Sequence, residues 1–213
     1  MGSLKEKEQI LFDEWQRKRL GFVSDGVVNE ELYLNSKPKI VYILKEVNGG
    51  ANWDLRDYLM SGARSQTWNN IARWTHGIRQ VYENTGISIP WNEIYDVDLE
   101  FRKAQLQSIC AVNVKKESGG SSADDNAVWD YMQQDKDFIL RQLEIYNADV
   151  VICCGIGYPN TSNVEWKMTL RGIRYGLDGN SIVISYVHPE VRCPANLVYY
   201  SLIDAVKEIA SSH

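Results

Sequence analysis

Four short apolar segments alternate with longer segments of helical periodicity, and this alternation constrains the fold more than any other feature of the chain. The apolar segments, each predicted to be a buried strand, are residues 38–44, 109–114, 149–154 and 182–187. Apolar side chains recur at or near helical spacing in the predicted helices at residues 5–20, 67–82 and 128–146, and further helices are expected at residues 55–59 and 195–209. Strands that alternate with helices favour a mostly parallel sheet covered by helices on both faces. The sequence therefore predicts an α/β fold: a three-layer α/β/α domain with a central, mostly parallel four-stranded sheet.

The length and composition are those of one globular domain. A chain of 213 residues can bury a sizeable core, and no internal repeat or linker divides it, so we expect residues 1–213 to form a single domain. No apolar run approaches the roughly 20 residues that cross a bilayer. Residues 1–9 are polar and charged, which is unlike a signal peptide. We expect a cytoplasmic monomer without membrane contact.

The cysteines do not have the spacing of a metal site. The four are Cys110, Cys153, Cys154 and Cys193, with no Cys-x-x-Cys pair among them. We expect them to be structural thiols in a reducing compartment, and we expect no metal and no cofactor. The formal net charge of −5 argues weakly against a nucleic-acid partner, although binding depends on local patches.

Polar loops follow all four predicted strands, at residues 46–57, 115–126, 155–163 and 188–192. Sheets of this kind place their binding sites beyond the carboxyl ends of the strands. The residues of a functional site are therefore expected in these loops. Other templates are missing: the chain has no Gly-x-Ser-x-Gly elbow, Gly119-Gly120-Ser121-Ser122 lacks the ending of a phosphate-binding loop, and Gly155-Ile156-Gly157 lacks a third glycine.

The first loop concentrates Glu46, Asn48, Trp53 and Asp54 directly after a buried strand. Carboxylates near one pocket can activate water or stabilise a developing cation. Asp54 has a second interpretation, because an Asp at a helix start commonly caps the helix. Glu46 has no such alternative, since it follows a strand and precedes a turn.

Two later loops begin with residues suited to base and phosphate recognition. Asn113 at a strand end presents one acceptor and two donors, and Lys115 and Lys116 follow it with charges that suit phosphate. A solvated loop with an Asn turn is the alternative interpretation. His188 follows the last strand, where a histidine can act as a donor in an active site or serve the structure alone.

These loops, in this order, resemble the uracil-DNA glycosylase superfamily. The segments that carry the resemblance are residues 44–50, 113–116, 138–143, 148–155 and the His-Pro pair 188–189. The similarity spans roughly residues 38–210, and residues 53–56 and 67–70 look like a bacterial branch of the group. Two features depart from the family pattern: Val47 stands where a proline is usual, and residues 190–194 differ from the usual DNA-wedging loop.

The resemblance implies a glycosylase that flips uracil or a modified pyrimidine out of single- or double-stranded DNA and cuts its N-glycosidic bond, in base-excision repair or in defence against phage DNA. Glu46 or Asp54 would stabilise the sugar cation, and His188 would donate to the base. The base contacts would come from Asn48, Trp53 and Asn113. The phosphate contacts would come from Lys115, Lys116 and Arg192, and with Arg171 and Arg174 these cations would surround the pocket mouth.

Two other classes remain open at this point. One is a non-catalytic nucleic-acid-binding module on the same fold. The other is a nucleoside deoxyribosyltransferase, which acts on free nucleosides and needs no cationic loop, in keeping with the acidic net charge.

Overall fold

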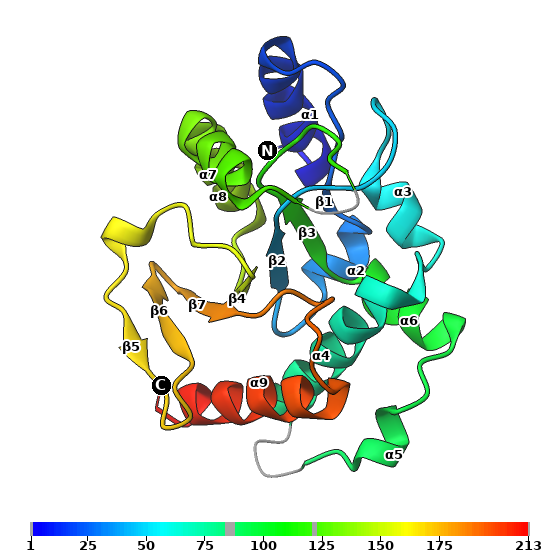
Figure 1. The fold of residues 1–213 in the computed structure, drawn as a ribbon, viewed down its shortest axis with the longest axis vertical. Helices are drawn as coiled ribbons and strands as arrows, with labels where there is room; N and C mark the ends of the chain where they lie inside the picture. Colours follow the sequence, from blue (N-terminus) through cyan, green and yellow to red (C-terminus); the bar gives the residue numbers. More distant parts are fainter. Residues whose placement is uncertain (1, 84–87, 121–122, 213) are drawn as a thin grey trace.

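A seven-stranded mixed sheet forms the centre of the protein (Figure 1). The computed structural model describes residues 2–83, 88–120 and 123–212. The strand order is β1-β3-β2-β4-β7-β6-β5. The strands are β1 (Gly26–Val27), β2 (Ile40–Leu44), β3 (Cys110–Asn113), β4 (Val150–Cys154), β5 (Lys167–Met168), β6 (Arg174–Asp178) and β7 (Ser181–Tyr186).

The four predicted strands form the parallel centre of this sheet. They are β3, β2, β4 and β7, and each pairs in parallel with its neighbour. In the registers, Leu44 lies opposite Asn113 and Ile43 lies opposite Cys153. The carboxyl ends of β2 and β3 therefore lie side by side, which brings the loops that follow them together.

The prediction of only four strands was wrong. At one edge β1 pairs antiparallel with β3, and at the other β6 pairs antiparallel with β7 and with β5. Strands of two residues, such as β1 and β5, are too short to show an alternating pattern, and Gly176 interrupts the pattern of β6. The sheet is mixed because β5, β6 and β7 follow one another as antiparallel hairpins at one edge, while β1 pairs with the distant β3 at the other.

Helices cover both faces of the sheet (Figure 1). Alternate residues of β2 point to opposite faces, so Tyr42 packs in one core and Val41 and Ile43 pack in the other. The first core includes α4 and α9, and the second includes α1 and α8. The α-helices are α1 (Leu4–Trp15), α2 (Glu30–Leu34), α3 (Leu55–Met60), α4 (Ser65–Glu83), α5 (Trp91–Ile94), α6 (Leu99–Gln107), α7 (Asp125–Gln134), α8 (Lys136–Tyr146) and α9 (Ala195–Ala210).

Two helix boundaries differ from the prediction. The apolar stripe of residues 128–146 belongs to two helices, which meet at Asp135, where Arg19 pairs with the buried carboxylate at 2.8 Å. The first helix ends at Trp15 and continues as a short 3-10 turn, Gln16–Lys18. A further 3-10 turn, Thr161–Asn163, follows β4. Apolar periodicity persists across the break at Asp135 because α7 and α8 face the same core, whereas the 3-10 turn after α1 has no buried residue.

A buried ion pair joins the start of the chain to the middle of the sheet. The Lys116 ammonium donates to both Asp25 carboxylate oxygens at 2.6 and 2.7 Å, and both side chains are fully buried. Gln142 of α8 accepts from Lys116 at 2.9 Å and donates to Asp25 at 2.8 Å. Burial lowers the pKa of Lys116, and the attraction of Asp25 opposes that shift. Every donor of the ammonium thus has an acceptor in a place that water does not reach.

This ion pair predicts a specific stability pattern. Lys116→Met keeps the length of the side chain but leaves the Asp25 charge buried without its partner, so we expect a loss of about 3–5 kcal/mol in the free energy of unfolding. The double variant D25N/K116M removes both charges and should regain most of that loss. Urea unfolding of the parent and both variants checks this. A K116M protein as stable as the parent would show that the pair is not buried in solution.

Candidate functional site

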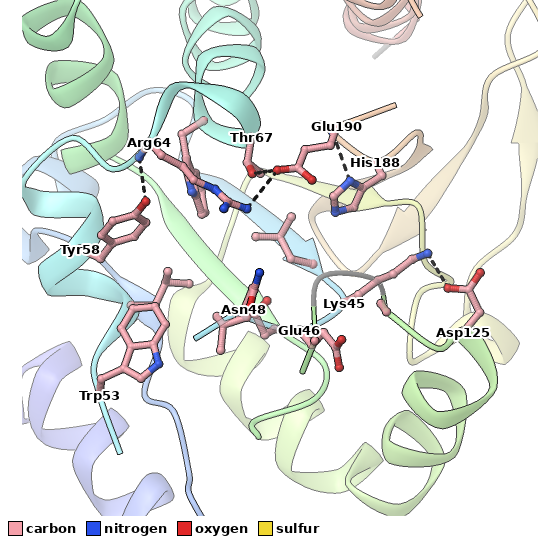
Figure 2. A pocket seen from close by; sticks show the side chains of 17 residues that line it. Lys45, Glu46, Asn48, Trp53, Tyr58, Arg64, Thr67, Asp125, His188 and Glu190 are labelled. Atoms are coloured by element: carbon pink, nitrogen blue, oxygen red, sulfur yellow. Dashed lines mark hydrogen bonds and ion pairs between the residues drawn. The ribbon is translucent and has the colours of Figure 1, made fainter. Parts of the chain in front are cut away.

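A cleft of about 660 Å³ opens at the carboxyl ends of β2 and β3 and beside the loop after β7 (Figure 2). We call it the strand-end cleft. Its lining residues are Leu44, Lys45, Glu46, Val47, Asn48, Trp53, Leu55, Tyr58, Arg64, Thr67, Trp68, Asn113, Gly120, Ala123, Asp125, His188 and Glu190. Of the residues predicted to be catalytic or to bind substrate, all except Asp54 therefore line a single cavity.

Glu46 leaves the end of β2 and is held by the loop after β3. The Lys115 ammonium donates to its Oε2 at 2.7 Å, and the two side chains are 15% and 7% exposed. The backbone of Gly119 passes so close that a Cβ there would collide with the Glu46 carboxylate. Oε1 has no hydrogen-bond partner within the described ranges. One oxygen of Glu46 is thus anchored, and the other remains available to a ligand or a water.

The two adjacent lysines, both predicted to contact phosphate, lie in different surroundings. Lys115 pairs with Glu46, and its ammonium also lies 5.4 Å from the ring centroid of Tyr131. Lys116 is fully buried against Asp25, so it cannot contact a phosphate, and that prediction was wrong. The backbone bends at residues 114 and 115, after the end of β3, and one lysine reaches the cleft loop while its neighbour enters the core.

Asn113 is the last residue of β3 and is 2% exposed. Its backbone N–H donates to Asp25 at 2.6 Å, and its carboxamide Nδ2 lies 3.4 Å from the same oxygen. The Asn113 carboxamide is thus held both by its place at the end of β3 and by Asp25 of the buried ion pair. The prediction that Asn113 belongs to the pocket is confirmed, and its turn interpretation is wrong because the residue is in a strand.

His188 lines the cleft from the loop after β7 and is held by its own loop (Figure 2). The backbone N–H of Glu190 donates to His188 Nδ1 at 3.2 Å. Burial lowers the pKa of the imidazole, so the ring is neutral at pH 7. Because Nδ1 accepts a hydrogen bond, the single ring proton resides on Nε2, which makes His188 a neutral donor toward a ligand.

Glu190 connects this loop to the start of α4. Its carboxylate accepts from the Thr67 hydroxyl and from Arg64 at 3.3 Å. Asn70 also donates to the Pro189 carbonyl oxygen at 2.7 Å. The histidine loop is therefore fastened at two points to the helix that forms the upper wall in Figure 2.

Aromatic side chains line the other wall. The rings of Trp53 and Tyr58 meet edge to face with centroids 6.1 Å apart (Figure 2). The Trp53 indole Nε1 has no hydrogen-bond partner in the part of the chain that the structure describes. Trp53 also packs partly against the core, so it serves the cleft and the fold together. Asn48 is exposed at the rim of the cleft, and its backbone forms an isolated parallel β-bridge with Gly119.

Asp54 does not line the strand-end cleft. Its carboxylate caps α3 by accepting the Arg56 backbone N–H at 2.8 Å, and it pairs with the Arg56 guanidinium at 2.6 Å. Arg56 in turn contacts Glu8 at 2.5 Å, and burial raises the pKa of that glutamate. The placement of Asp54 in the pocket was wrong, and the capping interpretation is confirmed.

The predicted ring of cations does not surround the cleft. Arg171 and Arg174 line a different hollow beside α9, where Arg171 pairs with Asp204 at 2.9 Å and Arg174 lies over Trp166. Arg192 is exposed but is not part of the cleft lining. The cations that do line the cleft are Lys45 and Arg64, which sequence reasoning missed.

The residues that the sequence analysis missed do not belong to any recognisable sequence motif. Lys45 pairs with Asp125 of α7 at 2.5 Å, a contact between residues far apart in sequence. Arg64 and Thr67 stand at a helix start, where polar residues are common for capping alone. Asp25 follows a serine and precedes a glycine, a combination typical of turns.

No group of three or more metal-ligating side chains occurs in residues 2–83, 88–120 and 123–212. In those same ranges, no helix is both long and apolar enough to cross a membrane. Cys110, Cys153 and Cys154 are buried free thiols, and burial raises their pKa, whereas Cys193 is exposed. The buried thiols pack as apolar side chains in the sheet.

Comparison with models of protein families and with curated proteins finds no match to this chain.

The capping role of Asp54 predicts a modest stability effect. Asp54→Ala removes the cap of α3 and should lower the free energy of unfolding by about 1 kcal/mol. Asp57→Ala is the matched control, because Asp57 lies in the first turn of the same helix but its exposed carboxylate has no hydrogen bond or ion pair within the described ranges. Thermal and urea melts of the two variants should show the larger loss for Asp54; equal losses would contradict the cap.

Proposed function

We propose that this protein is a DNA glycosylase that cuts the N-glycosidic bond of a flipped uracil or modified pyrimidine. One observation carries the proposal: Glu46, Asn113 and His188, which lie at or just after the carboxyl ends of three different parallel strands, line one cleft together with Trp53. These are the groups that the resemblance to uracil-DNA glycosylases assigns to cation stabilisation, base recognition and leaving-group stabilisation. The cleft volume of about 660 Å³ lies in the ordinary range for small-ligand sites and admits an extruded nucleotide.

The reaction creates a positive charge on the sugar and a negative charge on the base, and each proposed residue stabilises one of these charges. The C1′–N bond breaks with its electron pair going to the base, so the sugar becomes cationic and the base anionic. Water forms the new C1′–O bond, and the proton that it loses ends on the departing base. Groups that stabilise these charges only as they develop accelerate the reaction.

His188 acts on the departing base. Its Nε2–H donates to a base oxygen as negative charge builds there, while the Glu190 N–H holds Nδ1. A neutral donor with fixed orientation serves this step without bringing a full positive charge into the cleft beside Lys45 and Arg64.

Glu46 acts on the sugar side. Its Oε1 orients the attacking water and stabilises the cation, and Lys115 anchors Oε2 at 2.7 Å. Because the carboxylate is 7% exposed, bulk water screens its field only weakly. Trp53 and Tyr58 offer ring surfaces against which a flipped base can stack.

A second candidate is supported by the charge pairing in and around the cleft. Lys45, Arg64 and Lys115 each have a carboxylate partner, in Asp125, Glu190 and Glu46 respectively. Cations paired in this way offer less to a phosphate backbone than free ones. That observation favours an uncharged free nucleoside as the substrate, with the same bond cleaved, as in a nucleoside deoxyribosyltransferase.

One substrate panel tests both candidates. The protein is incubated with single-stranded and duplex oligonucleotides that each hold one altered pyrimidine, and separately with free deoxynucleosides. We expect abasic sites, scored by alkaline strand cleavage, in at least one oligonucleotide. Base release from nucleosides alone would instead support the second candidate. No release from any substrate would overturn the proposal.

Loss of the Glu46 charge and loss of the Asp54 charge should have different effects on the rate of cleavage. Glu46→Gln keeps size and hydrogen bonding but removes the charge, so single-turnover cleavage should fall by about two orders of magnitude or more while DNA binding stays near normal. Asp54→Asn is the matched control and should cleave close to the parent rate, since Asp54 caps α3 outside the cleft. If E46Q cleaves as fast as the parent, Glu46 has no catalytic role.

A further inference from the structure

The carboxylate of Asp25 lies directly behind the amide that lines the cleft. Asp25 precedes β1, is fully buried, and accepts five hydrogen bonds. Two of these come from Asn113, one from its backbone N–H at 2.6 Å and one from its carboxamide Nδ2 at 3.4 Å. The others come from Lys116 and Gln142, which hold the carboxylate in place from the opposite side.

We propose that Asp25 is a positioning residue: it fixes the orientation of the Asn113 carboxamide and thereby decides which pyrimidine edge the cleft accepts. The inference rests on the proposed function, because it concerns the substrate edge that Asn113 would contact. Nothing in the sequence marks Asp25 for this role, since it stands outside every loop that follows a parallel strand.

The physical reason is that an ionised carboxylate only accepts hydrogen bonds. The Nδ2 group of Asn113 can face Asp25, whereas the Oδ1 atom would bring a partial negative charge against a buried negative charge. That repulsion is strong where water is excluded. Lys116 and Gln142 prevent the carboxylate from turning away, so the amide has one favoured orientation and not two.

The orientation of the Asn113 carboxamide matters because the two pyrimidine classes present opposite patterns of hydrogen-bond donors and acceptors. A 4-oxo pyrimidine such as uracil has an N3–H donor beside an O4 acceptor, whereas a 4-amino pyrimidine such as cytosine has an N3 acceptor beside an N4–H donor. A carboxamide that is free to turn over can match either pattern. A carboxamide held by Asp25 offers its acceptor and its remaining donor in one order, so it matches one class.

The test uses two oligonucleotides that differ only at position 4 of the target pyrimidine. Asp25→Asn gives Asn113 a neighbour that both donates and accepts, so either amide orientation becomes allowed. The substitution is made alone and as D25N/K116M, which avoids a buried unpaired ammonium. We expect the parent to favour one oligonucleotide in single-turnover cleavage, and D25N/K116M to reduce that preference by about tenfold or more, the scale of one lost bidentate base contact.

The matched control is R19M/D135N, which removes another partly buried ion pair, 2.8 Å long, that does not contact Asn113. It should keep the parent preference. A structural role for Asp25 alone predicts that D25N/K116M slows cleavage of both oligonucleotides equally, and that result would overturn the inference. So would an unchanged preference in a folded variant.

A measurement independent of catalysis separates this inference from the proposed function. In ¹⁵N-labelled parent protein, the side-chain amide hydrogens of Asn113 should exchange with solvent slowly, and in D25N or D25N/K116M they should exchange at least about tenfold faster. Slow exchange in a parent that releases no base would reject the glycosylase but retain the positioning by Asp25. Fast exchange in the parent would reject the positioning, whatever the activity.

Discussion

The buried contact between Asp25 and Lys116 supports both the fold and the candidate site. It joins the segment before β1 to the loop after β3, and Gln142 adds α8 to the same cluster. A buried charge must keep its partner, so these segments have to come together in one arrangement. The same carboxylate binds Asn113 at the carboxyl end of β3. The geometry at the floor of the cleft therefore depends on contacts that lie beneath it.

The cleft itself is an arrangement of fastened loops. Lys115 anchors Glu46, Asp125 pairs with Lys45, and Glu190 ties the histidine loop to α4. Each contact joins a loop to a different element, so several functional groups are oriented before a ligand arrives. Such preorganisation suits a reaction in which charge develops briefly on the sugar and the base. The cations of the lining, Lys45 and Arg64, are both paired with carboxylates.

The sequence predicted the parallel centre of the sheet because four apolar runs were long enough to show a pattern. It missed β1, β5 and β6, whose lengths or glycines hide any alternation. Glu46, Asn113 and His188 could be predicted as a group because parallel strands end at the same edge. Asp54 kept two interpretations, cap and catalyst, and Lys116 was assigned wrongly, since a carboxylate or an ammonium looks the same in sequence whether it caps a helix, pairs in the core or faces a ligand.

The sequence by itself thus determined the α/β class, the four central strands and the polar loops at their carboxyl ends, because hydrophobic periodicity is a local property. Tertiary structure alone decided the partners of the charged groups at the cleft and in the buried ion pair beneath it. Lys115 and Lys116 are neighbours in sequence, yet one reaches Glu46 in the cleft and the other is fully buried against Asp25. Which of two neighbouring side chains is buried depends on the packing of distant elements, and this is why adjacent residues of the same type have different partners.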